Sequence, residues 1–137
     1  MQWSKTFGGT GADYGNHMVQ TTDGGYAICG MTLSFGAGSY DVYFVKTDTT
    51  GNMQWNKTYG GTLADLGYSV IQTSDGGYAI AGYTGSFGAG KADFYLIKTD
   101  IELGLAQIDS TANSVTLYRG ATDPYWNFVR VRIWKTS

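Results

Sequence analysis

Short runs of alternating apolar and polar residues recur along the chain between glycine-rich turns, and this pattern predicts β-strands throughout. The clearest turn signal is Asp-Gly-Gly, at 23–25 and again at 75–77, each time followed by Tyr-Ala-Ile. Aspartate tolerates left-handed backbone and glycine adopts positive φ without a Cβ clash, so each copy predicts a hairpin. The runs 42–45 and 94–97 are apolar on both faces, which predicts strands covered on both sides.

The two hairpins belong to a longer internal repeat. Residues 1–52 align with residues 53–104 without a gap, and about thirty positions are identical. The alternation inside each copy predicts four strands. They are expected at 1–7, 17–21, 26–32 and 41–48 in the first copy, and at 53–59, 69–73, 78–84 and 93–100 in the second.

The C-terminal part of the chain departs from this repeat. Residues 105–137 contain no Trp-x-Lys-Thr, and they predict three further strands at 105–110, 114–119 and 128–135. A divergent last unit is typical of the cap that repeat proteins carry. We therefore expect one repeat domain over 1–137, made of repeat 1–52, repeat 53–104 and a capping sheet at 105–137.

The period and the motifs indicate the fold class. A 52-residue period is close to that of a four-stranded propeller blade. The unit carries Trp-x-Lys-Thr-Tyr-Gly-Gly at 55–61, Asp-Gly-Gly-Tyr at 75–78, Ser-Phe-Gly-Ala-Gly at 86–90 and Lys-Thr-Asp at 98–100. In these motifs it resembles the propeller-type repeats of secreted and surface proteins of archaea and bacteria, over about three quarters of the chain. The tail at 117–126 resembles a segment that follows such repeats in archaeal proteins. The resemblance implies an all-β fold of four-stranded antiparallel blades and a place outside the cell or on its surface.

The low number of repeats predicts self-association. Propellers close with roughly four to eight blades, so two repeats and an atypical sheet make an incomplete ring. The apolar faces left open would drive assembly into a homo-oligomer, as a closed ring, a filament or a tube. Residues 1–7 of one chain are expected to complete the tail sheet of its neighbour. The tail also carries four basic and two acidic residues and aromatic residues outside the repeat. The expected self-association residues are Trp3, Tyr125, Trp126, Arg130, Arg132 and Trp134.

The sequence offers little for chemistry. A net charge of −2 gives no electrostatic case for nucleic acid. No apolar run is long enough to span a membrane. With one histidine, His17, and one cysteine, Cys29, we expect no metal site, and Cys29 is expected to pack, since Ala81 is its counterpart. The repeated aspartates are expected to serve turns and loops (Asp13, Asp23, Asp41 and their counterparts Asp65, Asp75, Asp93). We predict a non-enzymatic structural protein with no cofactor.

Two alternatives remain open. The first is an extracellular lectin-like or adhesive module that uses loop aromatics to bind a glycan or a surface protein. The second is a piece of a longer protein, because Met1-Gln2-Trp3 repeats the interior Met53-Gln54-Trp55. Asn56-Lys57-Thr58 is a sequon, so glycosylation at Asn56 is expected only if the chain is exported.

Overall fold

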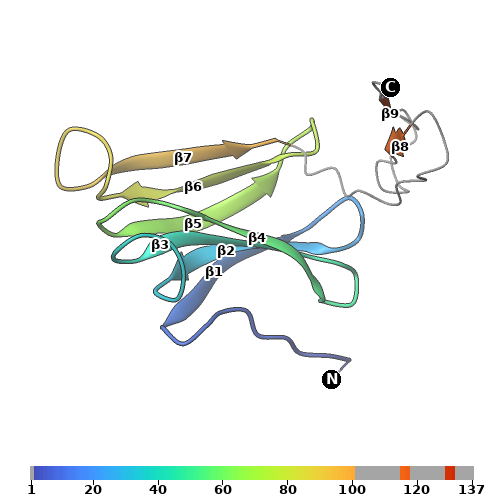
Figure 1. Ribbon diagram of the computed structural model, residues 1–137, viewed down its shortest axis with the longest axis horizontal. Helices are drawn as coiled ribbons and strands as arrows, with labels where there is room; N and C mark the ends of the chain where they lie inside the picture. Colours follow the sequence, from blue (N-terminus) through green and yellow to red (C-terminus); the bar gives the residue numbers. More distant parts are fainter. Residues whose placement is uncertain (1, 101–114, 118–128, 132–137) are drawn as a thin grey trace, which may run out of the picture. The chain divides into compact units, whose positions relative to one another are not determined.

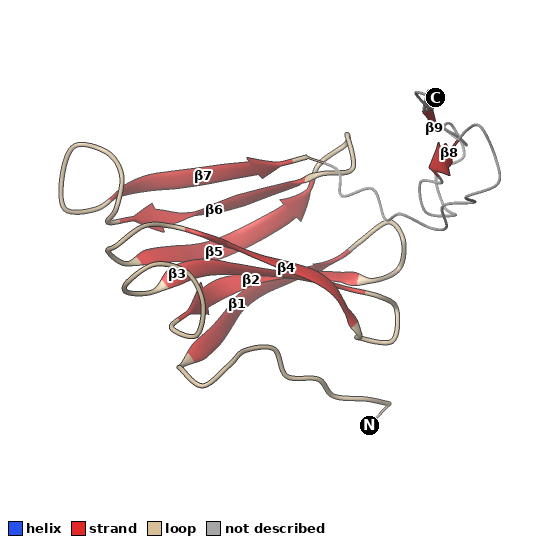
Figure 2. Cartoon of the chain, in the orientation of Figure 1, coloured by secondary structure: helices blue, strands red, loops and turns tan. Residues whose placement is uncertain are grey.

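The computed structural model describes residues 2–100, 115–117 and 129–131. Every regular element among these residues is a β-strand, with no helix (Figure 2). The chain divides into two compact units, residues 1–101 and 102–137. In the second unit the described strands are β8 (Val115–Leu117) and β9 (Val129–Val131), which pair antiparallel. They lie inside the strands expected at 114–119 and 128–135, whereas the strand expected at 105–110 falls outside the described residues.

The first unit holds seven antiparallel strands in two sheets (Figure 1). The first sheet has four strands in the order β1 (Asp13–Gln20), β2 (Tyr26–Thr32), β3 (Asp41–Thr47) and β4 (Met53–Tyr59). The second sheet has three strands in the order β5 (Asp65–Gln72), β6 (Tyr78–Thr84) and β7 (Asp93–Thr99). The strands expected at 26–32, 53–59 and 78–84 are confirmed to the residue.

The Asp-Gly-Gly segments form the predicted hairpin turns. In the first, Thr21 N–H donates to the Gly25 carbonyl at 2.9 Å, and Gly24 has φ of +82°. In the second, Thr73 N–H donates to Gly77 at 2.9 Å. This turn conformation requires the positive φ that glycine adopts without strain.

The strand expected at 1–7 is wrong for the residues that the structure describes. Residues 2–8 run as a loop and join no sheet (Figure 2). The free edge of β3 is taken instead by β4, which follows after the short turn 48–52 and pairs Phe44 with Lys57. The first sheet therefore takes its last strand from the second sequence repeat, and among the described residues the second sheet has three strands.

Two further strands begin earlier than expected. β1 starts at Asp13 and β5 at Asp65, four residues before the predicted 17 and 69. The glycine-containing starts of these strands still pair with β2 and β6, and a bulge between Gly15 and His17 and another between Gly67 and Ser69 absorb the irregularity. Bulges of this kind leave one residue unpaired and let the ladder continue.

The core of the first unit lies between the two sheets. Val42 and Phe44 of β3 are fully buried and belong to one apolar cluster with Val70 of β5 and Ile80 of β6. The ring of Phe44 meets that of Tyr78 edge-on, with centroids 5.1 Å apart. As predicted for the run 42–45, every residue of β3 is buried.

The corresponding prediction for 94–97 is wrong for the residues that the structure describes. Phe94 is 84% exposed and Leu96 is 68% exposed, while Tyr95 and Ile97 pack toward the core. One side of β7 therefore lacks the cover that β3 receives from the second sheet.

Candidate self-association surface

An apolar face is exposed on the second sheet. It consists of side chains that share one side of β5, β6 and β7, and we call it the open face. Phe94 and Leu96 are its most exposed members, whereas the residues 52 positions earlier, Val42 and Phe44, are 0% exposed. On this face, Leu96 pairs with Ala81 and Lys98 pairs with Ala79, so small side chains lie beside the large ones of β7. The open face comprises Ile71, Ala79, Ala81, Tyr83, Phe94 and Leu96.

A complementary apolar surface lies on the first sheet. Met18 of β1 is 49% exposed, whereas its counterpart Val70 is 1% exposed because it packs in the core between the sheets. Met18 pairs with Ile28, and Tyr26 is two residues before Ile28 on the same side of β2. We call Met18, Tyr26 and Ile28 the receiving face. Its counterparts Val70, Tyr78 and Ile80 are the residues of the second sheet that contact Val42 and Phe44 in the core cluster.

A cavity of about 160 Å³ borders the receiving face, lined by Phe7, Gly15 and Ile28 among others. The same position on the second sheet is filled. A Cβ built on Gly67 would lie 3.0 Å from Val42 Cγ1, whereas one built on Gly15 meets only Ile28, at 3.6 Å. The place that Val42 occupies between the two sheets is thus vacant on the first sheet.

Trp3 covers part of the receiving face, although it lies in a loop. Its ring meets Tyr26 edge-on at 5.8 Å, as Trp55 of β4 meets Tyr78 at 6.1 Å. Lys5 Nζ donates to Asn52 Oδ1 at 3.1 Å and ties the same segment to the turn before β4. Trp3 itself remains 43% exposed.

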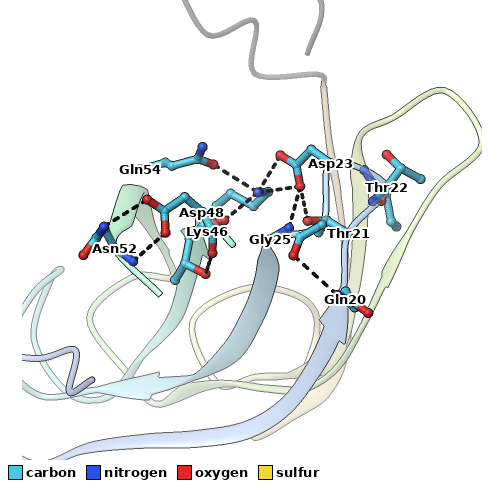
Figure 3. A network of polar contacts seen from close by, with 12 residues as sticks. Gln20, Thr21, Thr22, Asp23, Gly25, Lys46, Asp48, Asn52 and Gln54 are labelled. Atoms are coloured by element: carbon cyan, nitrogen blue, oxygen red, sulfur yellow. Dashed lines mark hydrogen bonds and ion pairs between the residues drawn. The ribbon is translucent and has the colours of Figure 1, made fainter. Parts of the chain in front are cut away.

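A polar network closes the edge of β3 where β4 joins it (Figure 3). Lys46 Nζ donates to Asp23 Oδ2 at 2.8 Å, to the Thr47 carbonyl at 2.7 Å and to Gln54 Oε1 of β4 at 3.0 Å. Burial works to raise the pKa of Asp23, but the hydrogen bonds from Lys46 and Thr21 outweigh it and hold that pKa below its ordinary value. The Lys46 side chain is only 5% exposed.

The equivalent network on β7 is incomplete. Lys98 Nζ contacts Asp75 Oδ2 at 2.7 Å and the Thr99 carbonyl at 2.8 Å, but its side chain is 45% exposed. The hydrogen bond from Lys98 is the main cause of the lowered pKa of Asp75. Among the residues that the structure describes, the second sheet has no strand in the place of β4 to supply the acceptor that Gln54 gives to Lys46.

The sequence predicts that four other aspartates bind loop amides (Asp13, Asp41, Asp65 and Asp93). The structure shows this hydrogen bond for the first three. Asp13 Oδ2 accepts from Gly9 N–H at 3.0 Å, Asp41 Oδ2 from Ala37 N–H at 2.8 Å, and Asp65 Oδ2 from Gly61 N–H at 2.8 Å. Burial raises the pKa of Asp41, and the nearby Asp65 carboxylate adds to the effect. Asp93 Oδ2 and Asp65 Oδ1 are buried and have no hydrogen-bond partner among the described residues.

Cys29 packs in the core, whereas His17 is exposed and makes a hydrogen bond between the two sheets. Cys29 is fully buried, and burial raises its thiol pKa to about 11, so the reactive thiolate is disfavoured at neutral pH. His17 Nδ1 accepts a hydrogen bond from Val70 N–H at 3.2 Å, which joins β1 to β5. Among the described residues, no three His, Cys, Asp or Glu side chains are grouped as a metal site requires. Within the same residues no helix is long and apolar enough to cross a membrane.

Of the self-association residues predicted from the sequence, the structure places two. Trp3 lies beside the receiving face, and Arg130 lies in β9. Four others lie outside the described residues (Tyr125, Trp126, Arg132 and Trp134). Sequence reasoning predicted that apolar faces would be left open but did not name the residues of the open face. Its signal was present, because 94–97 matches the two-sided apolar run 42–45 but is not followed by Trp-x-Lys-Thr.

Comparison with known proteins gives no family assignment: no family model matches the chain, and no curated protein matches it.

Proposed function

We propose that this chain is a non-enzymatic structural protein that assembles with copies of itself through its sheets, as propeller blades do, into a closed ring, a filament or a tube. One observation carries the proposal. Phe94 and Leu96 are 84% and 68% exposed, whereas the same positions of the preceding repeat are fully buried against another sheet. Exposed apolar patches of this kind mark interaction surfaces.

The receiving face makes a second copy the favoured partner. The chain already packs one such pair of surfaces, with Val42 and Phe44 against Val70, Tyr78 and Ile80. The open face is the second copy of the first surface, and the receiving face is the second copy of the other surface. A contact between the open face of one copy and the receiving face of the next is head-to-tail, and it closes into a ring or extends into a filament according to the angle of each step.

The roles of the aspartates and of Cys29 support the proposed absence of catalysis. Asp13, Asp41 and Asp65 accept hydrogen bonds from loop amides, and Asp23 and Asp75 contact lysines, which are structural roles. Cys29 is buried and protonated at neutral pH. The location outside the cell or on its surface rests on the resemblance to secreted and surface repeats. Asn56 is exposed on β4, so its sequon is accessible on this chain.

The deciding experiment is the particle mass in solution, measured by light scattering at micromolar concentration. We expect a multiple of the 14.8 kDa chain mass. The double variant Phe94→Ser with Leu96→Ser should be monomeric. The matched control is Leu63→Ser, which removes an exposed leucine (55%) from a loop, away from the open face, and should assemble normally. A monomeric wild-type chain would refute the proposal.

A second candidate, a glycan- or protein-binding module, is favoured by the exposed loop aromatics. Phe35 is 42% exposed and Phe87 is 51% exposed, at equivalent places in the two Ser-Phe-Gly-Ala-Gly loops. Each ring also contacts a strand tyrosine, Tyr43 and Tyr95, at 5.4 and 5.9 Å. A glycan array with wild type and Phe87→Ser tests this function, and no binding by the wild type would count against it.

A further inference from the structure

We propose that residues 2–7 of one copy form the fourth strand of the second sheet of another copy, antiparallel to β7. The inference rests on the proposed self-assembly and specifies its contact. Among the described residues the second sheet has three strands where the first has four, and no strand lies beside β7 in the place that β4 takes beside β3. The strand that fills this edge on the first sheet is β4, and residues 1–7 match its seven residues at five positions.

The pairing of β3 with β4 sets the expected register. Val42 pairs with Tyr59, Val45 with Asn56 and Lys46 with Trp55. Adding 52 to each β3 residue gives its β7 counterpart, and subtracting 52 from each β4 residue gives its counterpart in residues 3–7. The resulting pairs are the expected contacts between copies. In order along the strand, they are Phe94 with Phe7, Tyr95 with Thr6, Leu96 with Lys5, Ile97 with Ser4 and Lys98 with Trp3.

The donor segment already lies where a fourth strand should lie relative to the next sheet. Trp3 contacts Tyr26 as Trp55 of β4 contacts Tyr78, at 5.8 and 6.1 Å. The following loops also agree, since Gly9 N–H donates to Asp13 and Gly61 N–H donates to Asp65. Residues 2–8 therefore contact the first sheet in the same way that β4 and its loop contact the second sheet. Unlike β4, they do not pair with a described strand.

Side chains on both copies complete contacts that are open in the single chain. Gln2 would accept from the exposed Lys98 as Gln54 accepts from Lys46 at 3.0 Å. Leu96 would pack on Trp3 as Phe44 packs on Trp55, with ring centroids 5.2 Å apart. Phe94 would enter the cavity beside Gly15, the place that Val42 fills beside Gly67.

One other segment competes for the same edge. Residues 105–111 follow β7 in the chain as β4 follows β3, but they share no residue with β4 at the matching positions. They carry Ala106 where Gln54 stands and Gln107 where Trp55 stands. The chemistry of the edge, an exposed lysine and an apolar row, therefore favours residues 2–7 of a second copy.

Intermolecular disulfide formation tests the register. The background is Cys29→Ala, which removes the single cysteine and copies the alanine of the second repeat. One full-length chain carries Ser4→Cys and another carries Ile97→Cys, and the two are mixed and mildly oxidised. Opposed residues of neighbouring strands are about 4.5–5.5 Å apart at Cα, which is within disulfide reach. We expect a disulfide-linked dimer that joins one chain of each kind.

The register control pairs Ser4→Cys with Leu96→Cys, which shifts the contact by one residue to the other side of the sheet and should give only background linkage. The competing segment is tested in one chain with Ile97→Cys and Ile108→Cys, since Ile108 corresponds to Asn56. An intrachain link there, or no Ser4–Ile97 link in a particle that light scattering shows to be oligomeric, overturns the inference and leaves the proposed function standing. A monomeric Cys29→Ala parent overturns both.

Discussion

At the scale of single residues, the chain places the same side chains in two environments. Lys46 and Lys98 each contact an aspartate of the hairpin turn at 2.8 and 2.7 Å, yet the first is 5% exposed and the second 45%. An ion pair exposed to water contributes little to stability, whereas a buried ammonium that loses its partner is costly. Each repeat therefore serves as the control for the other.

This difference predicts unequal effects of one substitution. In the monomeric Phe94→Ser, Leu96→Ser chain, we expect Asp23→Asn to lower the free energy of unfolding by about 2 kcal/mol, because the buried Lys46 loses a charged acceptor. We expect Asp75→Asn to cost less than about 1 kcal/mol, because Lys98 stays hydrated. Urea denaturation measures both. Equal losses would contradict the assigned burial of Lys46.

Asp48 predicts a pH dependence at the turn between β3 and β4. The hydrogen bond from Asn52 N–H at 2.8 Å, with others from Thr50 and the Asn52 side chain, lowers the pKa of Asp48 from 3.8 to about 2. A depressed carboxyl pKa stabilises the fold above the unfolded value, and that stability is lost as pH falls through the folded value. We expect Asp48→Asn to melt below wild type at pH 5 and the gap in Tm to close between pH 3.8 and about 2. A gap that is constant with pH would show that Asp48 does not titrate in this way.

At the scale of elements, alternation and turn chemistry were enough to predict most strands, but they did not show which strands pair. Tyr26–Thr32 and Tyr78–Thr84 follow directly from their Asp-Gly-Gly turns. Residues 1–7 read as a strand because they match β4, but a strand also requires an edge to pair with, and no pattern in the segment records whether one is present. For the same reason the apolar run 94–97 predicts a covered strand, whereas none of the described residues covers Phe94 and Leu96.

Glycines in the middle strands predict how closely the strands approach. A Cβ at Gly82 of β6 would overlap the carbonyl oxygen of Leu66 on β5, whereas a Cβ at Gly90 meets nothing within 4 Å. We expect Gly82→Ala to destabilise the chain by about 1–3 kcal/mol, as overpacking typically does. Gly90→Ala is the control and should leave the midpoint of urea unfolding nearly unchanged. A stable Gly82→Ala variant would mean that the β5–β6 pairing is looser than this register.

At the scale of the whole molecule, the proposed assembly would use the same type of surface that stabilises the fold. The first unit buries one pair of apolar faces internally and leaves a second pair open, so association adds to folding the type of contact that already forms its core. Binding of folded copies stabilises the folded state by mass action, so the Tm of wild type is expected to rise with protein concentration.

The two repeat tryptophans should separate folding from assembly. Trp55 packs on Phe44 at 5.2 Å inside one chain, so we expect Trp55→Ala to lower the free energy of unfolding. Trp3 contacts Tyr26 but lies 43% exposed, so Trp3→Ala should mainly weaken association. A buried interface tryptophan typically contributes about 2 kcal/mol, or about 30-fold in Kd. Sedimentation over a dilution series measures this, and an unchanged dissociation constant for Trp3→Ala would remove Trp3 from the interface.

The first sheet takes its fourth strand, β4, from the following repeat. This arrangement has a consequence for chains with more repeats. Inserting a further copy of residues 53–104 would give the sheet before it a fourth strand and leave the last sheet short by one. However many repeats are added, one sheet of the repeats would still lack its fourth strand, and one segment equivalent to residues 2–7 would still be unused within the chain. Chains with different numbers of repeats could then assemble with one another through the same head-to-tail contact. In a closed ring the angular step between sheets sets the total, so a three-repeat chain should form particles with the same number of sheets from two thirds as many molecules.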